Sequence, residues 1–146
     1  MEEPWTNLHE ELLLEWKTNC EEFAKKHSKK AMKCKLWHQA IKLPSVIIPV
    51  IMAPITNGLK DYEYISQINT VGFILSAFLN AYYNFYDFQE KKEKHDQHAS
   101  HYYDLVTTID VVLSRGRTFR EPADRFFERI QAEIDILERT SPDIYY

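Results

Sequence analysis

The sequence predicts an all-α fold in which a hairpin of two transmembrane helices lies between long, amphipathic cytosolic helices. Two observations lead to this prediction. The middle of the chain, residues 43–88, is apolar except for a short polar loop, whereas both ends are rich in charged residues. In both ends the apolar residues recur at steps of three and four, which is the period of an amphipathic helix.

Length and composition exclude several classes of protein. The 146 residues give one domain of ordinary size. The net charge of −4 argues against a nucleic-acid-binding protein, which requires a strongly basic face. Cys20 and Cys34 are too far apart on one helix to form a disulfide with each other, and such sparse cysteines fit a reducing compartment. The first twenty residues lack a signal-peptide pattern, so the first span is expected to act as the insertion signal.

Residues 1–42 are expected to form an N-terminal cytosolic domain that consists mainly of one amphipathic helix, from Trp5 to Ile41. Its second half, from Lys25 to Lys42, is strongly basic. Such a run can simply be a solvated face. Close to a membrane entry it also favours a cytoplasmic N-terminus and attracts anionic lipid headgroups. The apolar stripe of this helix is predicted at Leu8, Leu12, Trp16, Cys20, Phe23, His27, Ala31, Cys34 and Leu36 or Trp37.

The hairpin is predicted at residues 43–88, with spans at about 40–59 and 65–87. Each is long enough to cross a bilayer, since about 20 helical residues cover its ~30 Å hydrocarbon layer. The polar loop at residues 60–64 is expected on the side of the membrane opposite both termini. The first span carries three prolines that predict a kinked or broken helix, either packed on its partner or serving as a deformable or pore-lining element: Pro44, Pro49 and Pro54.

The second span has a polar face, although it has no charged side chain between Tyr64 and Tyr86. Small and polar residues follow one another at steps of three and four, within a sector of about 120°. This face either joins helices or forms the wall of a water-filled pore built by several copies. Both interpretations require neighbouring helices and therefore predict a homo-oligomer. The residues are Asn69, Gly72, Ser76, Asn80, Asn84 and Asp87.

Residues 89–146 are expected to form the C-terminal cytosolic helices. The helix of the second span is predicted to continue from Ile65 to Ser114, and Gly116 ends it. A last helix begins near Glu121 and ends at Ser141. The aromatic residues and charges at the membrane exit again indicate the cytoplasmic side. We expect the soluble helices to pack together beneath the membrane.

Three histidines of the C-terminal region have spacings that metal ligands use: His95, His98 and His101. Histidines at i and i+3 on a helix can share a metal ion, and Asp104 or His27 could complete the set. The alternatives are a pH-sensitive polar cluster or ordinary surface histidines. The sequence predicts no bound metal and no cofactor.

The layout resembles the SLATT group of small two-span proteins with flanking cytosolic helices. The resemblance implies a pore-forming effector, and the chain is most similar to the free-standing forms of eukaryotes and large DNA viruses, which lack a sensor domain. Residues along most of the chain carry this resemblance. In the N-terminal half they are the helix around Trp16 that leads into Lys25-Lys26-His27, and Pro44-Ser45 at the entry to the first span. In the C-terminal half they are Phe85 to His95, Arg120-Glu-Pro-Ala-Asp124 before Phe126-Phe127, and Ser141-Pro-Asp-Ile144.

The sequence contains no Gly-rich phosphate loop, nucleophile elbow or zinc-protease motif, so no enzyme is expected. The leading hypothesis is a homo-oligomeric membrane pore or cation channel, integral to the membrane, with both termini in the cytoplasm. Its expected partners are membrane lipids, other copies of the chain and cations, but no nucleic acid. The alternative is a non-conducting membrane scaffold whose cytosolic helices recruit protein partners. A soluble helical bundle with a buried hairpin is a third interpretation.

Overall fold

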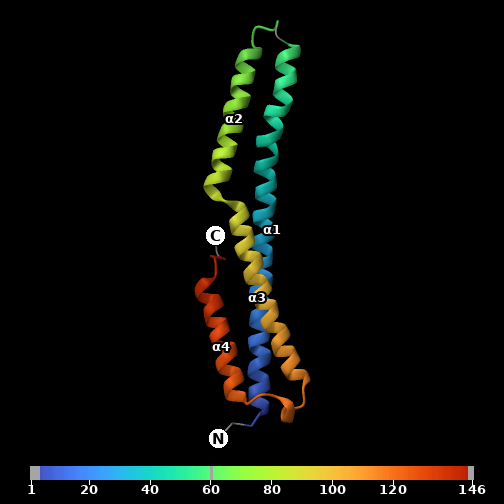
Figure 1. Cartoon of the computed structure of the whole chain (residues 1–146), viewed down its shortest axis with the longest axis vertical. Helices are drawn as coiled ribbons and strands as arrows, with labels where there is room; N and C mark the ends of the chain where they lie inside the picture. The colour runs from blue at the N-terminus through green and yellow to red at the C-terminus, as the bar shows by residue number, and fades with distance from the viewer. Residues whose placement is uncertain (1–3, 60, 145–146) are drawn as a thin grey trace. The chain divides into compact units, whose positions relative to one another are not determined.

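The structure is a computed structural model that describes residues 4–59 and 61–144, and these are all-α, as predicted (Figure 1). The elements are α1 (Asn7–Gly58), α2 (Ile65–Tyr86), α3 (Phe88–Ser114), the short 3-10 helix η1 (Arg117–Phe119) and α4 (Ala123–Thr140). The chain divides into two compact units. We call residues 1–31 with 93–146 the three-helix unit, and residues 32–92 the hairpin unit. Helices α1 and α3 each contribute to both.

Helix α1 unites two predicted elements, because the N-terminal helix and the first apolar stretch form one helix of 52 residues. Thr6 caps its start, where the Thr6 hydroxyl oxygen accepts the backbone N–H of His9 at 3.3 Å. Pro44, Pro49 and Pro54 all lie inside the helix, and none of them breaks it.

Helices α2 and α3 are separate, so the predicted continuous helix from Ile65 to Ser114 is wrong. The break is at Asp87, which has a left-handed backbone conformation with φ of 39°. Asp tolerates this conformation better than most residues. Its carboxylate also accepts the backbone N–H of Glu90 at 3.1 Å and so caps the start of α3. Asp87 therefore ends one helix and starts the next.

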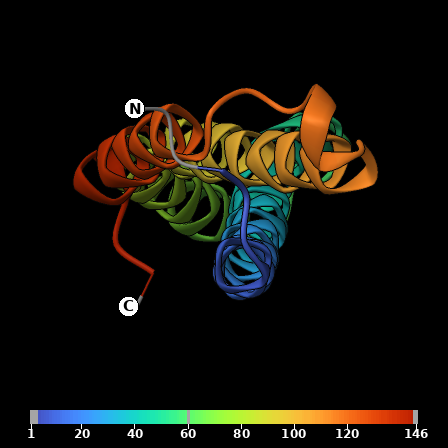
Figure 2. The ribbon, with the colours of Figure 1, turned by 90° about the horizontal axis from the view of Figure 1, so that it is seen from below.

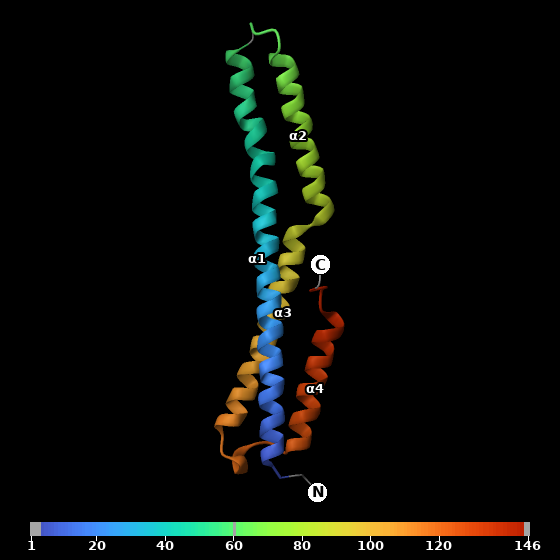
Figure 3. The ribbon, with the colours of Figure 1, turned by 180° about the vertical axis from the view of Figure 1, so that it is seen from behind.

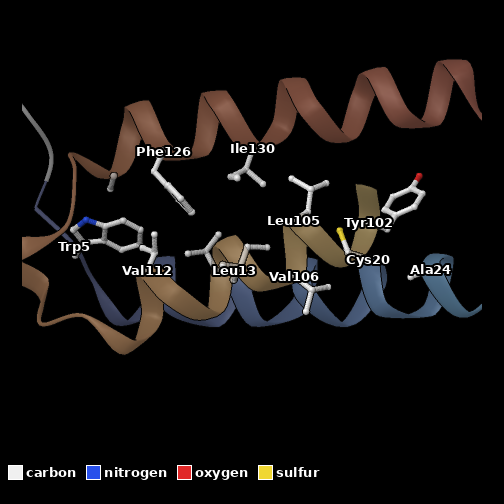
Figure 4. Packing of buried hydrophobic residues seen from close by; sticks show 12 residues of the cluster. Trp5, Leu13, Cys20, Ala24, Tyr102, Leu105, Val106, Val112, Phe126 and Ile130 are labelled. Atoms are coloured by element: carbon white, nitrogen blue, oxygen red, sulfur yellow. The ribbon is translucent and has the colours of Figure 1, made fainter. Parts of the chain in front are cut away.

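The three-helix unit is a bundle of the first part of α1, most of α3 and α4, which surround a common interior in Figure 2. Figure 4 shows Phe126 and Ile130 of α4 pointing toward the side chains of α1 and α3. The apolar stripes predicted for the last two helices are confirmed, because each supplies buried side chains at steps of three and four. The core comprises Leu13, Cys20 and Ala24 of α1, Tyr102, Leu105, Val106, Ile109 and Val112 of α3, and Ala123, Phe126 and Ile130 of α4, with Trp5.

The stripe predicted for α1 is correct only in part. Cys20, His27 and Ala31 are buried as expected, but Leu8 is exposed and Leu13, absent from the predicted stripe, is completely buried. Three consecutive leucines, at positions 12–14, made several registers equally apolar, and packing against α3 and α4 selects the one with Leu13 inside.

One end of the three-helix unit is held together by Arg120, whose side chain is only 5% exposed. Its guanidinium donates to Glu10 Oε1 at 2.6 Å and to the carbonyls of Leu113 at 3.1 Å and Arg115 at 2.9 Å. It also lies 5.0 Å from the centre of the Trp5 ring. These contacts join the α3–α4 connection to the start of α1.

The hairpin unit consists of the second part of α1 and α2, which run antiparallel and side by side in Figures 1 and 3. The predicted loop at residues 60–64 connects them, although Lys60 lies outside the described residues.

Two spans were predicted, and the structure contains one candidate span. Among the residues the structure describes, only α1 contains a stretch that is long and apolar enough to cross a membrane, judged by length and composition. Most side chains of this stretch are exposed. Helix α2 falls short because glutamine and asparagine interrupt its apolar residues at Gln67, Asn69, Asn80 and Asn84.

Candidate functional site in the helical hairpin

The two helices of the hairpin unit meet along a line of side chains that we call the hairpin seam. On each helix the least exposed positions recur mainly at alternating steps of three and four, the pattern of a coiled-coil contact. The seam comprises Cys34, His38, Ile41, Ser45, Ile48, Met52 and Thr56 of α1, and Ile65, Asn69, Gly72, Ser76, Leu79 and Tyr83 of α2.

At the centre of the seam, Ser76 supplies a hydrogen bond that Pro49 removes from α1. Proline has no N–H, so the carbonyl four residues earlier, that of Ser45, has no helical donor. The Ser76 hydroxyl donates to this carbonyl oxygen at 2.7 Å. Ser45 and Ser76 are 2% and 4% exposed, so water does not take this role. The bond satisfies the carbonyl that Pro49 leaves without a helical donor, which gives the serine of α2 a structural role here.

Further contacts define the rest of the seam. A Cβ at Gly72 would lie 3.3 Å from the Met52 side chain, so glycine permits the two backbones to approach closely. Toward the other end, the Tyr83 hydroxyl and His38 Nδ1 are hydrogen-bonded at 3.3 Å. Lys42 lies 5.6 Å from the centre of the Tyr83 ring. Polar and small residues thus provide most of the specific contacts between the helices.

The predicted polar face of α2 divides into two parts. Asn69, Gly72 and Ser76 lie in the seam, whereas Asn80, Asn84 and Asp87 are exposed. The reason is geometric: a step of four residues turns a helix by about 40° beyond a full circle. The two successive steps of four after Ser76 therefore carry the asparagines to the flank of the seam. The structure does not place the six residues along a single surface.

The outer faces of the hairpin are apolar. Of the described residues in this unit, only Ile41, Ser45 and Ser76 are buried, and two of these three are serines. Large apolar side chains are usually buried in water-soluble proteins, whereas most of those in the hairpin unit are exposed. The exposed apolar side chains include Leu43, Val46, Ile47, Val50 and Ile51 of α1, and Ile68, Val71, Phe73, Ile74, Leu75, Phe78 and Phe85 of α2.

The histidines proposed as metal ligands are not arranged to hold a metal ion. The rings of His95 and His98 both lie against His27, with ring centres 5.2 and 5.5 Å apart, whereas His101 is exposed. Within the described part of the chain, no group of three or more histidine, cysteine, aspartate or glutamate side chains is arranged to hold a metal ion.

Several residues at these sites were not identified from the sequence. Ser45 was named only within the resemblance to the SLATT group, although its position four residues before Pro49 marks the carbonyl that needs a donor. Asp87 was assigned to the polar face and not recognised as a helix end. Ser141 was recognised as a helix end and within the resemblance to the SLATT group, and its contact with His27 could not be predicted.

Comparisons with protein families, with curated proteins and with solved structures found no match to this chain. The resemblance to the SLATT group stays a prediction.

Proposed function

We propose that this chain is an integral membrane protein whose helical hairpin assembles with other copies into a pore for cations. The observation that carries the proposal is the exposure of most large apolar side chains of the hairpin unit, while Ser45 and Ser76 are buried beside Ile41. In water, apolar exposure costs about 25 cal/mol per Å². In a bilayer the same faces lie against lipid, and small or polar residues in the contact are what hold membrane helices together.

The two helices have different requirements in a bilayer. Helix α1 is apolar enough to span by itself, judged by length and composition. Helix α2 carries exposed amides at Asn80 and Asn84, which need hydrogen-bond partners in the hydrocarbon layer. Helix α1 already packs against the seam face of α2 and leaves both of these amides exposed. Further copies of the chain would supply the missing partners, so α2 completes the span only within an oligomer.

The flank formed by Asn80, Asn84 and Asp87 is the surface best suited to line a water-filled path. Its amides can replace part of an ion's hydration shell, and a ring of Asp87 carboxylates concentrates cations. Asn69 and Ser76 are assigned to the hairpin seam instead. The path in this proposal is therefore shorter than the full polar face of α2.

The orientation we propose places both termini in the cytoplasm. Basic residues of α1 come before the first span, and basic residues of α3 come after the second span. Two spans return the chain to the side on which it began, so both groups lie on the same side of the membrane, which the excess of basic residues marks as cytoplasmic. Membrane lipids, further copies of the chain and cations are the partners in this proposal. It assigns no enzymatic activity, and it agrees with what the resemblance to the SLATT group, including its viral forms, implies.

The second candidate is a non-conducting membrane scaffold. The bond between Ser76 and Ser45 favours it, because this part of the polar face joins helices instead of facing water. In that case Asn80 and Asn84 would likewise only connect subunits, and the three-helix unit would bind protein partners.

Conductance distinguishes the two candidates. We expect the full chain in planar bilayers to conduct cations in preference to anions, Asp87→Asn to reduce this preference, and Asn84→Leu to block the current. Asn is a good test because it retains an oxygen to cap α3 and tolerates the left-handed backbone while removing the charge. Asp104→Asn, an exposed change in the three-helix unit, should leave the current unchanged.

Two results would count against the pore. Absence of current from a correctly assembled oligomer would favour the scaffold. A current that Asp87→Asn and Asn84→Leu both leave unchanged would show that the path lies elsewhere.

A further inference from the structure

A pair of histidines is buried where the three helices of the three-helix unit meet. His27 of α1 is 0% exposed and His95 of α3 is 5% exposed. Their Nδ1 atoms are 2.9 Å apart, which is hydrogen-bond distance. The His27 ring also stacks on Tyr102, with ring centres 5.9 Å apart. Nothing in the proposed pore uses this pair.

One placement of the protons satisfies all the contacts around the pair. The Ser141 hydroxyl, just after α4, donates to the Pro142 carbonyl at 3.2 Å. Its oxygen is then free to accept the Nε2–H of His27, also at 3.2 Å. A neutral His27 with its hydrogen on Nε2 has a lone pair on Nδ1, so this atom accepts the Nδ1–H of His95. One chain of hydrogen bonds thus runs from α3 through α1 to the end of α4.

Each further proton disturbs this arrangement. A proton on His27 Nδ1 would leave two N–H donors facing each other at 2.9 Å with no acceptor between them. A proton on the other nitrogen of His95 would place a positive charge in a buried position.

The charged groups around the pair do not compensate for such a charge. Lys30 on α1 and His98 on α3 act against a positive charge at His95, and Asp96 on α3 acts in its favour. His98 also acts against a charge at His27. From the α4 side, Ser141 contributes a hydroxyl, and Glu138 acts on Tyr102 and Cys20.

We propose that the His27–His95 pair is an acid-sensitive latch: it holds α1, α3 and the end of α4 together when neutral, and protonation opens the three-helix unit. The proposal does not depend on the membrane pore, because all of its contacts lie within the three-helix unit.

The direction of the pKa shifts agrees with this role. Burial, and then the neighbouring histidines, lowers the pKa of His27 from 6.5 to about 4. Burial, followed by Lys30 and His98, also lowers the pKa of His95. The unfolded chain therefore binds these protons more readily than the folded one between pH 6.5 and 4. Stability is full above pH 6.5 and is lost as the pH falls through this window.

The test is the pH dependence of unfolding of the full chain in detergent. For His27 alone, the folding equilibrium constant should fall by about 100-fold between pH 7 and pH 4. The double variant His27→Gln with His95→Gln should lose most of this dependence, whereas His101→Gln, an exposed change on α3, should retain it. Arg117 and Arg120 lower the pKa of Glu10 to about 2, so Glu10 acts mainly at lower pH.

A second measurement uses the unaltered chain, in case the double variant does not fold. NMR of the imidazole rings should show His27 neutral in the folded state at pH 5.5, with faster hydrogen exchange at the end of α4 at pH 5 than at pH 7 after correction for intrinsic rates. A His27 that becomes charged near pH 6 while α4 stays protected would overturn the proposal. So would a double variant with the full pH dependence.

Discussion

Replacement of Phe126 by alanine is expected to lower the free energy of unfolding of the three-helix unit by about 3–5 kcal/mol. The Phe126 ring is completely buried between α4 and the other two helices. Its centre lies 5.8 Å from that of the Trp5 ring and 5.2 Å from the Arg129 guanidinium. Truncation leaves a cavity that well-packed helices cannot close, so the loss exceeds the transfer free energy of the ring alone.

The measurement is denaturant unfolding of the full chain in mild detergent, followed by the fluorescence of Trp5 and Trp16, which both pack in or against this core. The matched control is Phe119→Ala. Phe119 is 81% exposed, so its loss should change the free energy of unfolding by less than about 0.5 kcal/mol. Equal effects of the two substitutions would show that this bundle is not the core of the folded chain.

Replacement of Ser76 by alanine is expected to weaken the contact between α1 and α2 by about 1–3 kcal/mol. The substitution removes the hydroxyl that donates to the Ser45 carbonyl, at a site too buried for water. Because Pro49 has no N–H, the helix itself cannot replace the lost bond. Ser66→Ala, an exposed change on the same helix, is the control and should have little effect.

A double-mutant cycle with Pro49→Ala shows whether this explanation is correct. Alanine at position 49 restores a backbone N–H for the Ser45 carbonyl, so Ser76→Ala should cost much less in that background. Thermal unfolding of the hairpin, followed by circular dichroism, provides the four values. If Ser76→Ala costs the same in the Pro49→Ala background as in the unaltered chain, the serine does not compensate for the proline.

The helices of the three-helix unit could largely be predicted from the sequence. Stripes such as Tyr102, Leu105 and Ile109 have a strict helical period, and only one face of each helix can bury them. The start of α4 at Pro122 and its end before Ser141 follow from local backbone chemistry. Where several registers were equally apolar, as at Leu12–Leu14, the choice depends on packing with distant residues and was not visible.

The break at Asp87 could not be predicted from periodicity. The residues on both sides of it favour helix, and the break depends on a left-handed backbone with a side-chain cap. The sequence predicted a kinked or broken helix at the prolines, and α1 is not broken. The donor for the Ser45 carbonyl comes from α2, 31 positions later in the sequence, and no local pattern contains it.

The candidate site was predicted in part. The sequence identified Asn69, Gly72 and Ser76 as residues that can join helices, and the structure places them in the hairpin seam. It also grouped them with Asn80 and Asn84, because residues on an ideal helix within about 120° share a broad face. A seam with alternating steps of three and four is narrower than that sector, so the two asparagines lie outside it.

The proposed membrane hairpin requires that its apolar outer faces lie in lipid, and spin labels in a bilayer show directly whether they do. Labels are placed at cysteines that replace Val50 of α1, Phe78 of α2 or, as the control, Leu8 in the three-helix unit, all of which are exposed. The background carries Cys34→Ala and retains Cys20, because burial raises the pKa of its thiol to about 11 and keeps it unreactive. If the hairpin lies in lipid, oxygen should reach the labels at positions 50 and 78 and a water-soluble relaxing agent should not, with the opposite result at position 8. If the water-soluble agent reaches positions 50 and 78 as readily as position 8, the hairpin lies in water and is not a membrane hairpin.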